Sequence, residues 1–303
     1  MTRTNPHLEI LASAPALAAR AAEFFVSSIA AGLQDRHRFV VALSGGRTPH
    51  RFNQAIVDLA RTTARASAAA TATRAAARTT AEMWNRVHVL YADERAVPID
   101  HEANNHRMTE ETLLRQIAVL PQHVHRINAD DGDHVRAARD YSQLIVREYK
   151  EHIDLIVLGM GEDGHTASLF PDAETKAEAE AHSQVDGPEA NARTIDDEVA
   201  IPTFAPRNAS VRRRVSLSYR SIVGADAALV LVSGPSKASR FAQVWAGVDA
   251  QVSARDRALP LENVLQLRAT LGRPTRILID QDAGALIEAS GRDYEPRVQQ
   301  EEQ

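Results

Sequence analysis

The chain has 303 residues, of which 44% are hydrophobic and 25% are charged, and its formal net charge is -5 at pH 7. This is the composition of an ordinary globular protein, and the charge provides no general attraction to nucleic acid or to an anionic membrane, so an anionic ligand has to be held by a local basic site. The sequence contains no cysteine, which excludes disulfides, thiolate nucleophiles and cysteine-based metal sites and fits a reducing compartment.

The N-terminal segment, residues 1–25, has a basic start but no uninterrupted apolar core after it, so we do not expect a secretory signal. No uninterrupted apolar run approaches the roughly 20 residues that a membrane-spanning helix needs. We therefore expect a cytoplasmic protein that binds neither membranes nor nucleic acid. Its oligomeric state cannot be read from the sequence, and a monomer is favoured.

Predicted strands and helices alternate along the first half of the chain. Residues 39–43, FVVAL, form a short continuous apolar run of the kind that a buried parallel strand shows. The other strands are predicted at residues 8–12 and 86–91, and the helices at residues 16–33, 49–59, 104–117 and 133–151.

The second half continues this pattern, beginning with an apolar run at residues 153–158 that ends in a glycine-rich loop. Residues 166–168 after that loop are predicted to start a helix. Further strands are predicted at residues 211–219, 227–232 and 276–280, and further helices pass through residues 241–245 and 283–287. This alternation predicts an α/β fold whose mainly parallel sheet is covered by helices on both faces.

Two segments stand apart from the pattern. Residues 61–81 form a low-complexity run of Ala, Thr and Arg that cannot contribute much to a core, so we predict either a surface extension of the preceding helix or a partly disordered insertion. Residues 172–198 are acidic and alanine-rich, and we predict that they form a long insertion on the surface. We predict one domain over residues 1–291 with insertions near 61–82 and 172–198, and a polar tail over 292–303.

The loop after the strand at residues 153–158 delivers one carboxylate and one imidazole, Asp163 and His165, to the carboxyl end of that strand. In an open α/β sheet, ligands bind beyond the carboxyl ends of the strands. A histidine titrates near neutral pH, and a carboxylate two residues away can orient it, so the pair suits acid–base chemistry. A turn with a surface histidine explains the same residues equally well.

The loop after residues 39–43 has groups suited to a phosphate. Gly45 and Gly46 expose backbone N–H groups, a helix beginning near Pro49 points its positive end at the loop, and Ser44, Arg47 and Thr48 add donors. The spacing matches neither a Walker motif nor G-x-G-x-x-G, so an ordinary tight turn is about as plausible as a phosphate loop.

Three basic residues elsewhere are further candidates for binding an anion. Lys237 follows a strand near a helix start, and Arg214 lies in an arginine triplet whose alternation places Arg212 and Arg214 on one face. Arg95 ends the run Asp93-Glu94-Arg95, which either contacts a polyol or forms an ion pair within its loop. Each residue considered alone is equally consistent with solvated surface.

Other chemistries have little support. The histidines at positions 101, 106, 123 and 125 match no zinc signature, and we expect no metal or cofactor. The G-x-S-x-G elbow of serine hydrolases is missing. Acid–base chemistry on a small phosphorylated substrate remains.

Taken together, five segments resemble the 6-phosphogluconolactonase family. They are LSGGRTP at 43–49, DER at 93–95, GMGEDGHTASLFP at 159–171, RVSL at 214–217 and GPSK at 234–237. The match runs in order from about Leu8 to Ile287, and the third segment is highly specific.

The resemblance implies a doubly wound α/β fold related to glucosamine-6-phosphate deaminase, no metal or cofactor, and hydrolysis of the lactone ring of 6-phospho-D-gluconolactone in the pentose phosphate pathway. It implies that His165 is the general acid/base and Asp163 its partner. The residues implied to hold phosphate or sugar hydroxyls are Ser44, Gly45, Gly46, Arg47, Thr48, Arg95, Gly164, Arg214 and Lys237. Arg47 departs from the family, which usually has a small hydroxyl residue there, so it either strengthens phosphate binding or points away.

Two rival functions are compatible with this fold. A sugar-phosphate deaminase or isomerase has Asp-Glu-Tyr where this chain has Asp93-Glu94-Arg95, which favours the lactonase. A non-catalytic sugar-phosphate sensor would have lost the acid–base pair, whereas both Asp163 and His165 are present.

Overall fold

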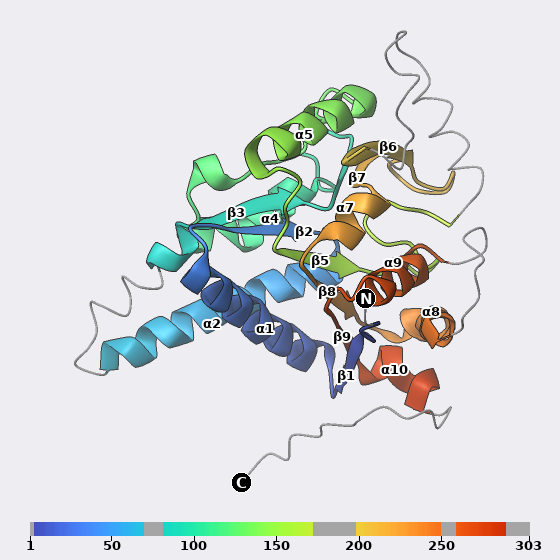
Figure 1. Cartoon of the computed structure of the whole chain (residues 1–303), viewed down its shortest axis with the longest axis horizontal. Coiled ribbons are helices and arrows are strands. Elements are labelled where there is room, and N and C mark those ends of the chain that lie inside the picture. Colours follow the sequence, from blue (N-terminus) through green and yellow to red (C-terminus); the bar gives the residue numbers. More distant parts are fainter. Residues whose placement is uncertain (1–2, 70–80, 172–197, 250–258, 289–303) are drawn as a thin grey trace.

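The protein is described by a computed structural model over residues 3–69, 81–171, 198–249 and 259–288. A six-stranded parallel sheet in the order β1-β9-β8-β5-β2-β3 forms its centre (Figure 1). The strands are β1 His7–Leu11, β2 Phe39–Leu43, β3 Val87–Tyr91, β5 Leu155–Gly159, β8 Ala227–Val232 and β9 Thr275–Asp280.

Strand order reverses between β2 and β5. From β2 the chain moves outward to β3, whereas β5 lies on the other side of β2 and is followed outward by β8 and β9. The connections after β2 and β5 therefore diverge at neighbouring strands, and this topological switch point is where open α/β sheets leave a crevice for ligands.

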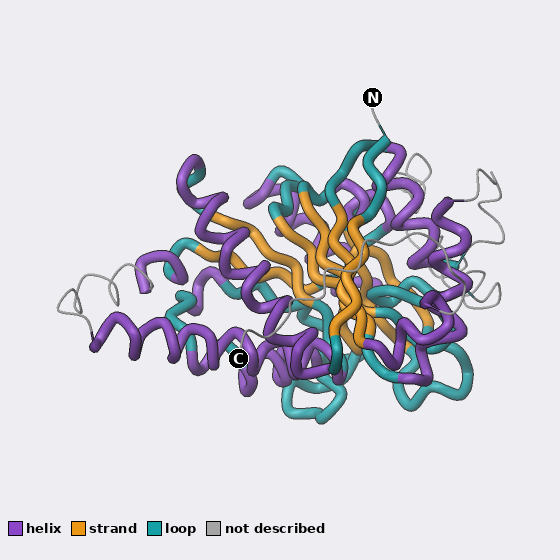
Figure 2. The backbone as a smooth tube through the Cα atoms, turned by 90° about the horizontal axis from the view of Figure 1, so that it is seen from below, coloured by secondary structure: helices purple, strands orange, loops and turns teal. Residues whose placement is uncertain are grey.

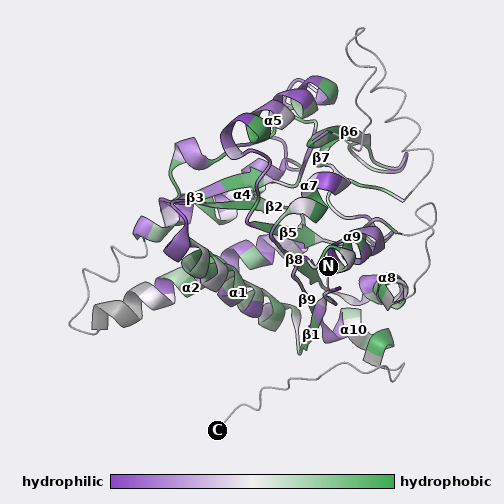
Figure 3. Ribbon diagram, in the orientation of Figure 1, coloured by the Kyte–Doolittle hydropathy of each residue, from purple (hydrophilic) through white to green (hydrophobic). Residues whose placement is uncertain are grey.

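Helices cover both faces of the sheet (Figure 2). Their hydrophobic residues alternate with hydrophilic ones along α1 and α5, while the strands at the centre are predominantly hydrophobic (Figure 3). The helices are α1 Ala14–Asp35, α2 Arg47–Ala69, α4 Asn105–Thr112, α5 His134–Tyr149, α7 Tyr219–Gly224, α8 Ala238–Asp249, α9 Pro260–Thr270 and α10 Gln281–Glu288, with 3-10 turns at Leu114–Gln116, Pro121–His123 and Pro235–Lys237.

Helix α1 is long and apolar enough to cross a membrane, judged by length and composition alone, although its apolar residues do not form an uninterrupted run. In the structure it packs on α2 and on strands of the sheet, and residues such as Leu17, Phe25 and Ile29 are buried there. Its apolar face thus belongs to the protein core.

A second, antiparallel sheet of three strands lies beside the first, in the order β4 Asp93–Arg95, β7 Arg213–Leu217 and β6 Ala200–Phe204. Strand β4 follows β3 after Ala92, whose N–H donates to the carbonyl of Leu43 in β2 and whose carbonyl accepts from Leu217 in β7. This double contact joins the small sheet to the carboxyl edge of the large one.

The predicted fold class is confirmed, and the predicted strands and helices are present with shifts at their ends, except for the helix predicted to start at residues 166–168. The helix predicted over residues 104–117 ends at Thr112 and is followed by the 3-10 turn Leu114–Gln116. Residues 61–69 extend helix α2, in agreement with one of the two alternatives for that segment, while residues 70–80 and 172–197 lie outside the described residues. The division into one domain with insertions and a tail stays a prediction. Strand β6 and helices α7 and α9 were not predicted.

The prediction of a helix starting at residues 166–168 is wrong for the described chain up to Pro171. The Thr166 hydroxyl donates to the carbonyl of Gly159 at 2.8 Å, Thr166 and Leu169 form an isolated bridge, and Ala167 has a left-handed φ of 48°. Serine and threonine side chains that bond nearby backbone in this way favour turns over helices.

Candidate active site

The candidate site lies at the carboxyl edge of the large sheet, where the loops after β2, β5 and β8 emerge side by side. Val41 and Ala42 of β2 pair with Leu155 and Ile156 of β5, and Gly159 at the end of β5 pairs with Leu231 in β8. The parallel register therefore brings together the three loops that the sequence singled out.

The predicted acid–base pair is formed within the β5 loop. His165 Nδ1 lies 2.6 Å from Asp163 Oδ1, and the same oxygen accepts the backbone N–H of His165 at 3.1 Å. The turn is closed by bonds from Gly161 N to His165 O and from Gly164 N to Gly161 O, at 2.8 and 3.1 Å. A side chain at Gly161 would overlap the imidazole, because its Cβ would lie 2.1 Å from Nδ1, so the pair needs glycine there.

The electrostatics of this pair fix the tautomer of the imidazole. Burial acts to raise the pKa of Asp163, but the hydrogen bonds and the charge of His165 outweigh it and hold that pKa below its ordinary value. Asp163 is therefore an acceptor, and Nδ1 must carry the proton between them. Within the described part of the chain nothing hydrogen-bonds to Nε2, and the His165 side chain is 32% exposed, so Nε2 is available to a substrate.

The β2 loop leads into α2 as the sequence predicted, with Pro49 in the first helical turn. Gly46 has a φ of +111°, and a side chain at Gly45 would collide with Asn105, since its Cβ would lie 1.8 Å from the amide oxygen. Ser44 is buried and its hydroxyl has no hydrogen-bond partner among the described residues, while Thr48 is half-buried. The glycines thus serve close packing and a tight turn.

Arg95 and Arg214 are brought together by the small sheet. They are directly opposite each other in the antiparallel pairing of β4 with β7. Burial and the neighbouring charge of Arg95 lower the pKa of Arg214 to about 10, against the attraction of Asp93 and Glu94. Two adjacent guanidinium groups repel each other, so an anion bound between them would stabilise the arrangement.

A pocket of about 440 Å³ lies between the start of α2 and the start of α4. Three predicted residues, Gly46, Arg47 and Arg95, line it. The other predicted site residues do not: Ser44, Gly45, Thr48, Asp163, Gly164, His165, Arg214 and Lys237. The remaining lining residues are His50, Arg51, Glu102, Asn104, Asn105 and Met108. Arg47 thus faces this pocket from one side and Arg95 from the other.

Lys237 lies near the acid–base pair. Burial lowers the pKa of its ammonium group, with a smaller contribution from Arg47, while Glu162 and Asp163 act in the opposite direction. Lys237 therefore interacts electrostatically with Arg47 after the β2 loop and with Glu162 and Asp163 in the β5 loop. Gly164 has a φ of +88° and its carbonyl accepts from Leu261 N at 3.2 Å, so it holds the β5 loop against α9.

Two residues that shape the site, Asn105 and Ser168, were not predicted, and Asp93 and Glu94 were named only as groups that contact a polyol or form an ion pair within their loop. Asn105 packs on Gly45 and donates to the Asp93 carbonyl at 2.9 Å. Ser168 donates to the Asp93 carboxylate at 2.7 Å, and Glu94 accepts three backbone N–H groups. The pair Asn104-Asn105 at a predicted helix start was the available signal, because asparagine is a preferred N-cap, but its contacts depend on tertiary packing.

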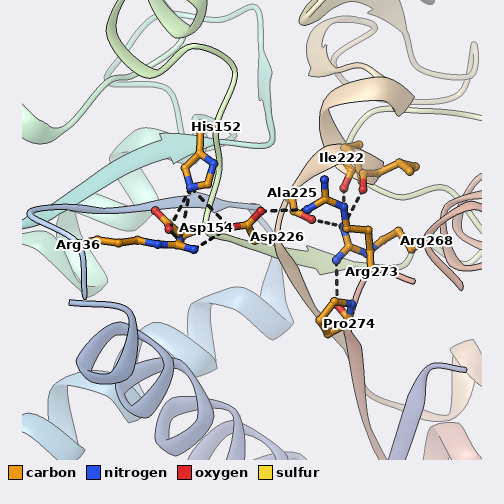
Figure 4. Close-up of polar contacts among 10 residues, drawn as sticks. Arg36, His152, Asp154, Ile222, Ala225, Asp226, Arg268, Arg273 and Pro274 are labelled. Carbon is orange, nitrogen blue, oxygen red and sulfur yellow. Dashed lines mark hydrogen bonds and ion pairs between the residues drawn. The ribbon is translucent and has the colours of Figure 1, made fainter. Parts of the chain in front are cut away.

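Among the described residues, one group has ligand atoms close enough together to share a metal ion: His152, Asp154 and Asp226. The Arg36 guanidinium already pairs with both carboxylates, and Arg273 pairs with Asp226 at 3.0 Å (Figure 4). The group precedes β5 and β8, at the edge of the sheet opposite the candidate site. Its carboxylates are neutralised by arginine, so it reads as an ion-pair network.

Comparisons with known proteins agree with this geometry. The model of the family "Glucosamine-6-phosphate isomerases/6-phosphogluconolactonase" matches residues 12–270. A 6-phosphogluconolactonase of Nostoc sp. is 27% identical over 259 residues, covering 84% of this chain and 88% of the relative. One of Mycobacterium leprae is 30% identical over 213 residues, covering 67% of this chain and 74% of the relative.

Solved structures show the same fold at lower identity. The 6-phosphogluconolactonase from Trypanosoma cruzi superposes with a TM-score of 0.68 at 21% identity, covering 94% of this chain and 97% of that one. A monomeric glucosamine-6-phosphate deaminase superposes with a TM-score of 0.63 at 17% identity, covering 92% and 99%. The chain therefore belongs to the glucosamine-6-phosphate isomerase/6-phosphogluconolactonase family, among its 6-phosphogluconolactonases.

Proposed function

We propose that the chain hydrolyses 6-phospho-D-glucono-1,5-lactone to 6-phospho-D-gluconate, with His165 as the general acid/base and Asp163 as the residue that orients it. The observation that supports this most directly is the 2.6 Å contact between His165 Nδ1 and Asp163 Oδ1, which places a proton on Nδ1 and leaves Nε2 without a hydrogen-bond partner among the described residues. An unprotonated imidazole nitrogen is a base suited to neutral pH.

In the proposed reaction, water attacks the lactone carbonyl carbon while Nε2 of His165 takes one of its protons. The resulting tetrahedral intermediate collapses by breaking the bond between that carbon and the ring oxygen, and the imidazolium returns the proton to the departing oxygen. The carboxylate of Asp163 stabilises the imidazolium between these steps. The ring is opened and His165 ends in its starting state.

The basic residues around this pair would bind the phosphate and the sugar hydroxyls. Support comes from Arg95 and Arg214, which lie opposite each other in the pairing of β4 with β7, from the half-buried Lys237, and from Arg47 at the start of α2. Groups that hold the phosphate equally in the ground state and in the transition state mainly lower KM.

The test is a lactonase assay run beside a measurement of ammonia release from glucosamine 6-phosphate. We expect lactone opening well above the spontaneous rate and no ammonia. His165→Ala should lower kcat by at least about 100-fold, the lower end of a general acid–base contribution, and retain binding of 6-phosphogluconate. His37→Ala, which changes an exposed histidine, is the control.

Each alternative outcome has a clear meaning. Ammonia release would identify the deaminase, binding of 6-phosphogluconate without turnover would identify a sensor, and an unchanged kcat in His165→Ala would remove that residue from the mechanism.

A further inference from the structure

Glu94 is a buried carboxylate beside the candidate site that the proposed reaction does not use. Glu94 is only 1% exposed to solvent. Its Oε1 accepts the backbone N–H groups of Arg95 and Asn105, both at 2.8 Å, and its Oε2 accepts that of His106 at 2.9 Å. One side chain therefore joins strand β4 to the first turn of helix α4.

The residues tied together in this way form one wall of the pocket. Arg95 and Asn105 line it directly, and the guanidinium of Arg95 donates to the carbonyl of Ala103 at 2.7 Å, just ahead of α4. The side chain of Asn105 in turn packs against Gly45 of the β2 loop. Moving the start of α4 would therefore move Arg95 and disturb the β2 loop as well.

We propose that Glu94 is a positioning residue for anion binding, which acts by holding Arg95 and the first turn of α4 in place. This inference rests on the proposed role of Arg95 in binding the substrate phosphate. Glu94 itself does not touch the substrate. Its three hydrogen bonds are all to backbone, so it sets the position of the chain, while Nε of Arg95, which is buried and has no hydrogen-bond partner among the described residues, is left to meet an anion.

The charged and titratable groups around Glu94 come from five elements. They are Asp93 and Arg95 in β4, Arg214 in β7, Tyr91 at the end of β3, Tyr141 in α5 and His106 at the start of α4. Burial raises the pKa of Glu94 to about 7, against the lowering effect of its backbone hydrogen bonds.

A purely electrostatic role of Glu94 would change anion affinity in the opposite direction. Where Glu94 is ionised, its negative charge repels a bound phosphate, so if only that charge mattered, removing it would tighten anion binding. If its hydrogen bonds position the wall, removing the carboxylate should weaken anion binding, because the neutral amide of glutamine presents an N–H group to the N–H of His106. The direction of the change in KM therefore distinguishes an electrostatic role of Glu94 from a positioning role.

The experiment is steady-state kinetics on Glu94→Gln and Glu94→Asp, together with calorimetric titration of sulfate, which keeps its charge across the useful pH range. For Glu94→Gln we expect KM and the sulfate dissociation constant to rise about tenfold, as for the loss of one well-made hydrogen bond to a charged group, with kcat within about twofold. Glu94→Asp keeps the charge but is one methylene shorter, so it should raise both constants too.

Asp154→Asn is the matched control for a general loss of stability. Asp154 is also a buried carboxylate that accepts a backbone N–H, from Val40 at 2.6 Å, but it lies at the opposite edge of the sheet. It should lower the melting temperature and leave KM and sulfate affinity unchanged.

The inference is overturned if both Glu94 variants leave KM and sulfate affinity unchanged or tighten them, or if Asp154→Asn changes them equally. Sulfate binding needs no turnover, so an inactive wild-type protein whose sulfate affinity still depends on Glu94 would reject the proposed function and keep the positioning role.

Discussion

Replacing Arg268 by methionine should destabilise the fold without impairing the site. Arg268 lies in α9, is 0% exposed, and has the pKa of its guanidinium lowered to about 10 by burial and by Arg273. It donates five hydrogen bonds of 2.8–3.1 Å, to Thr275 Oγ1, to the carbonyls of Ile222, Val223 and Ala225 at the end of helix α7, and to the carbonyl of Pro274 before β9. Ile222, Ala225 and Pro274 are labelled in Figure 4. Methionine keeps the length of the side chain and removes every donor.

The expected cost follows from two opposing terms. A hydrogen bond to a charged group contributes about 1.5 kcal/mol at the lower end, so five contribute about 7.5 kcal/mol. Removing the buried cation also removes its desolvation penalty, which we take as about 4 kcal/mol. The free energy of unfolding should therefore fall by about 3.5 kcal/mol, and the melting temperature by about 7 °C for a chain of this length.

The assay is urea denaturation, with the slope m compared between variants so that a change in midpoint reports stability. Arg273→Met is the control, because this side chain is 40% exposed and makes an ion pair with Asp226, which should contribute no more than about 1 kcal/mol. Arg268 lies near the amino ends of β8 and β9, away from the site, so kcat/KM of the folded variant should not change. A loss no larger than that of Arg273→Met would refute the reasoning.

Two further outcomes test the site and the edge of the sheet. Gly161→Ala should lower kcat by about 100-fold at unchanged fold, because the new Cβ would lie 2.1 Å from His165 Nδ1. Gly159→Ala is the control and should have a much smaller effect, because no atom lies within 4 Å of its Cβ. Equal kcat values in the two variants would contradict this reasoning. Burial and His123 lower the pKa of His88 to about 4, so the unfolded state binds more protons between about pH 6.5 and 4, and stability should fall as the pH drops through that window. The urea midpoint measured from pH 7.5 to 4.5 should depend less on pH in His88→Asn, and an identical dependence would exclude His88 as the cause.

Local sequence was sufficient for the elements whose pattern is continuous and apolar. Residues 39–43 are all buried in β2, and the alternation of such runs with helices implies a parallel sheet. The pattern failed where a residue's role is set by distant partners. Strand β6 contains Pro202, which an edge strand tolerates, and α9 buries the charged Arg268, which weakens its apolar face.

The sequence by itself determined the contact between Asp163 and His165, because they are two residues apart and the glycines between and before them allow one tight turn to join them. Only the tertiary structure decided what surrounds that pair. Arg95 meets Arg214 through a strand pairing between segments far apart in the chain, and Glu94 holds both β4 and α4 through backbone groups. Every residue except proline has a backbone donor, so residue type does not show which donors a buried carboxylate will meet, and contacts of this kind follow from tertiary packing.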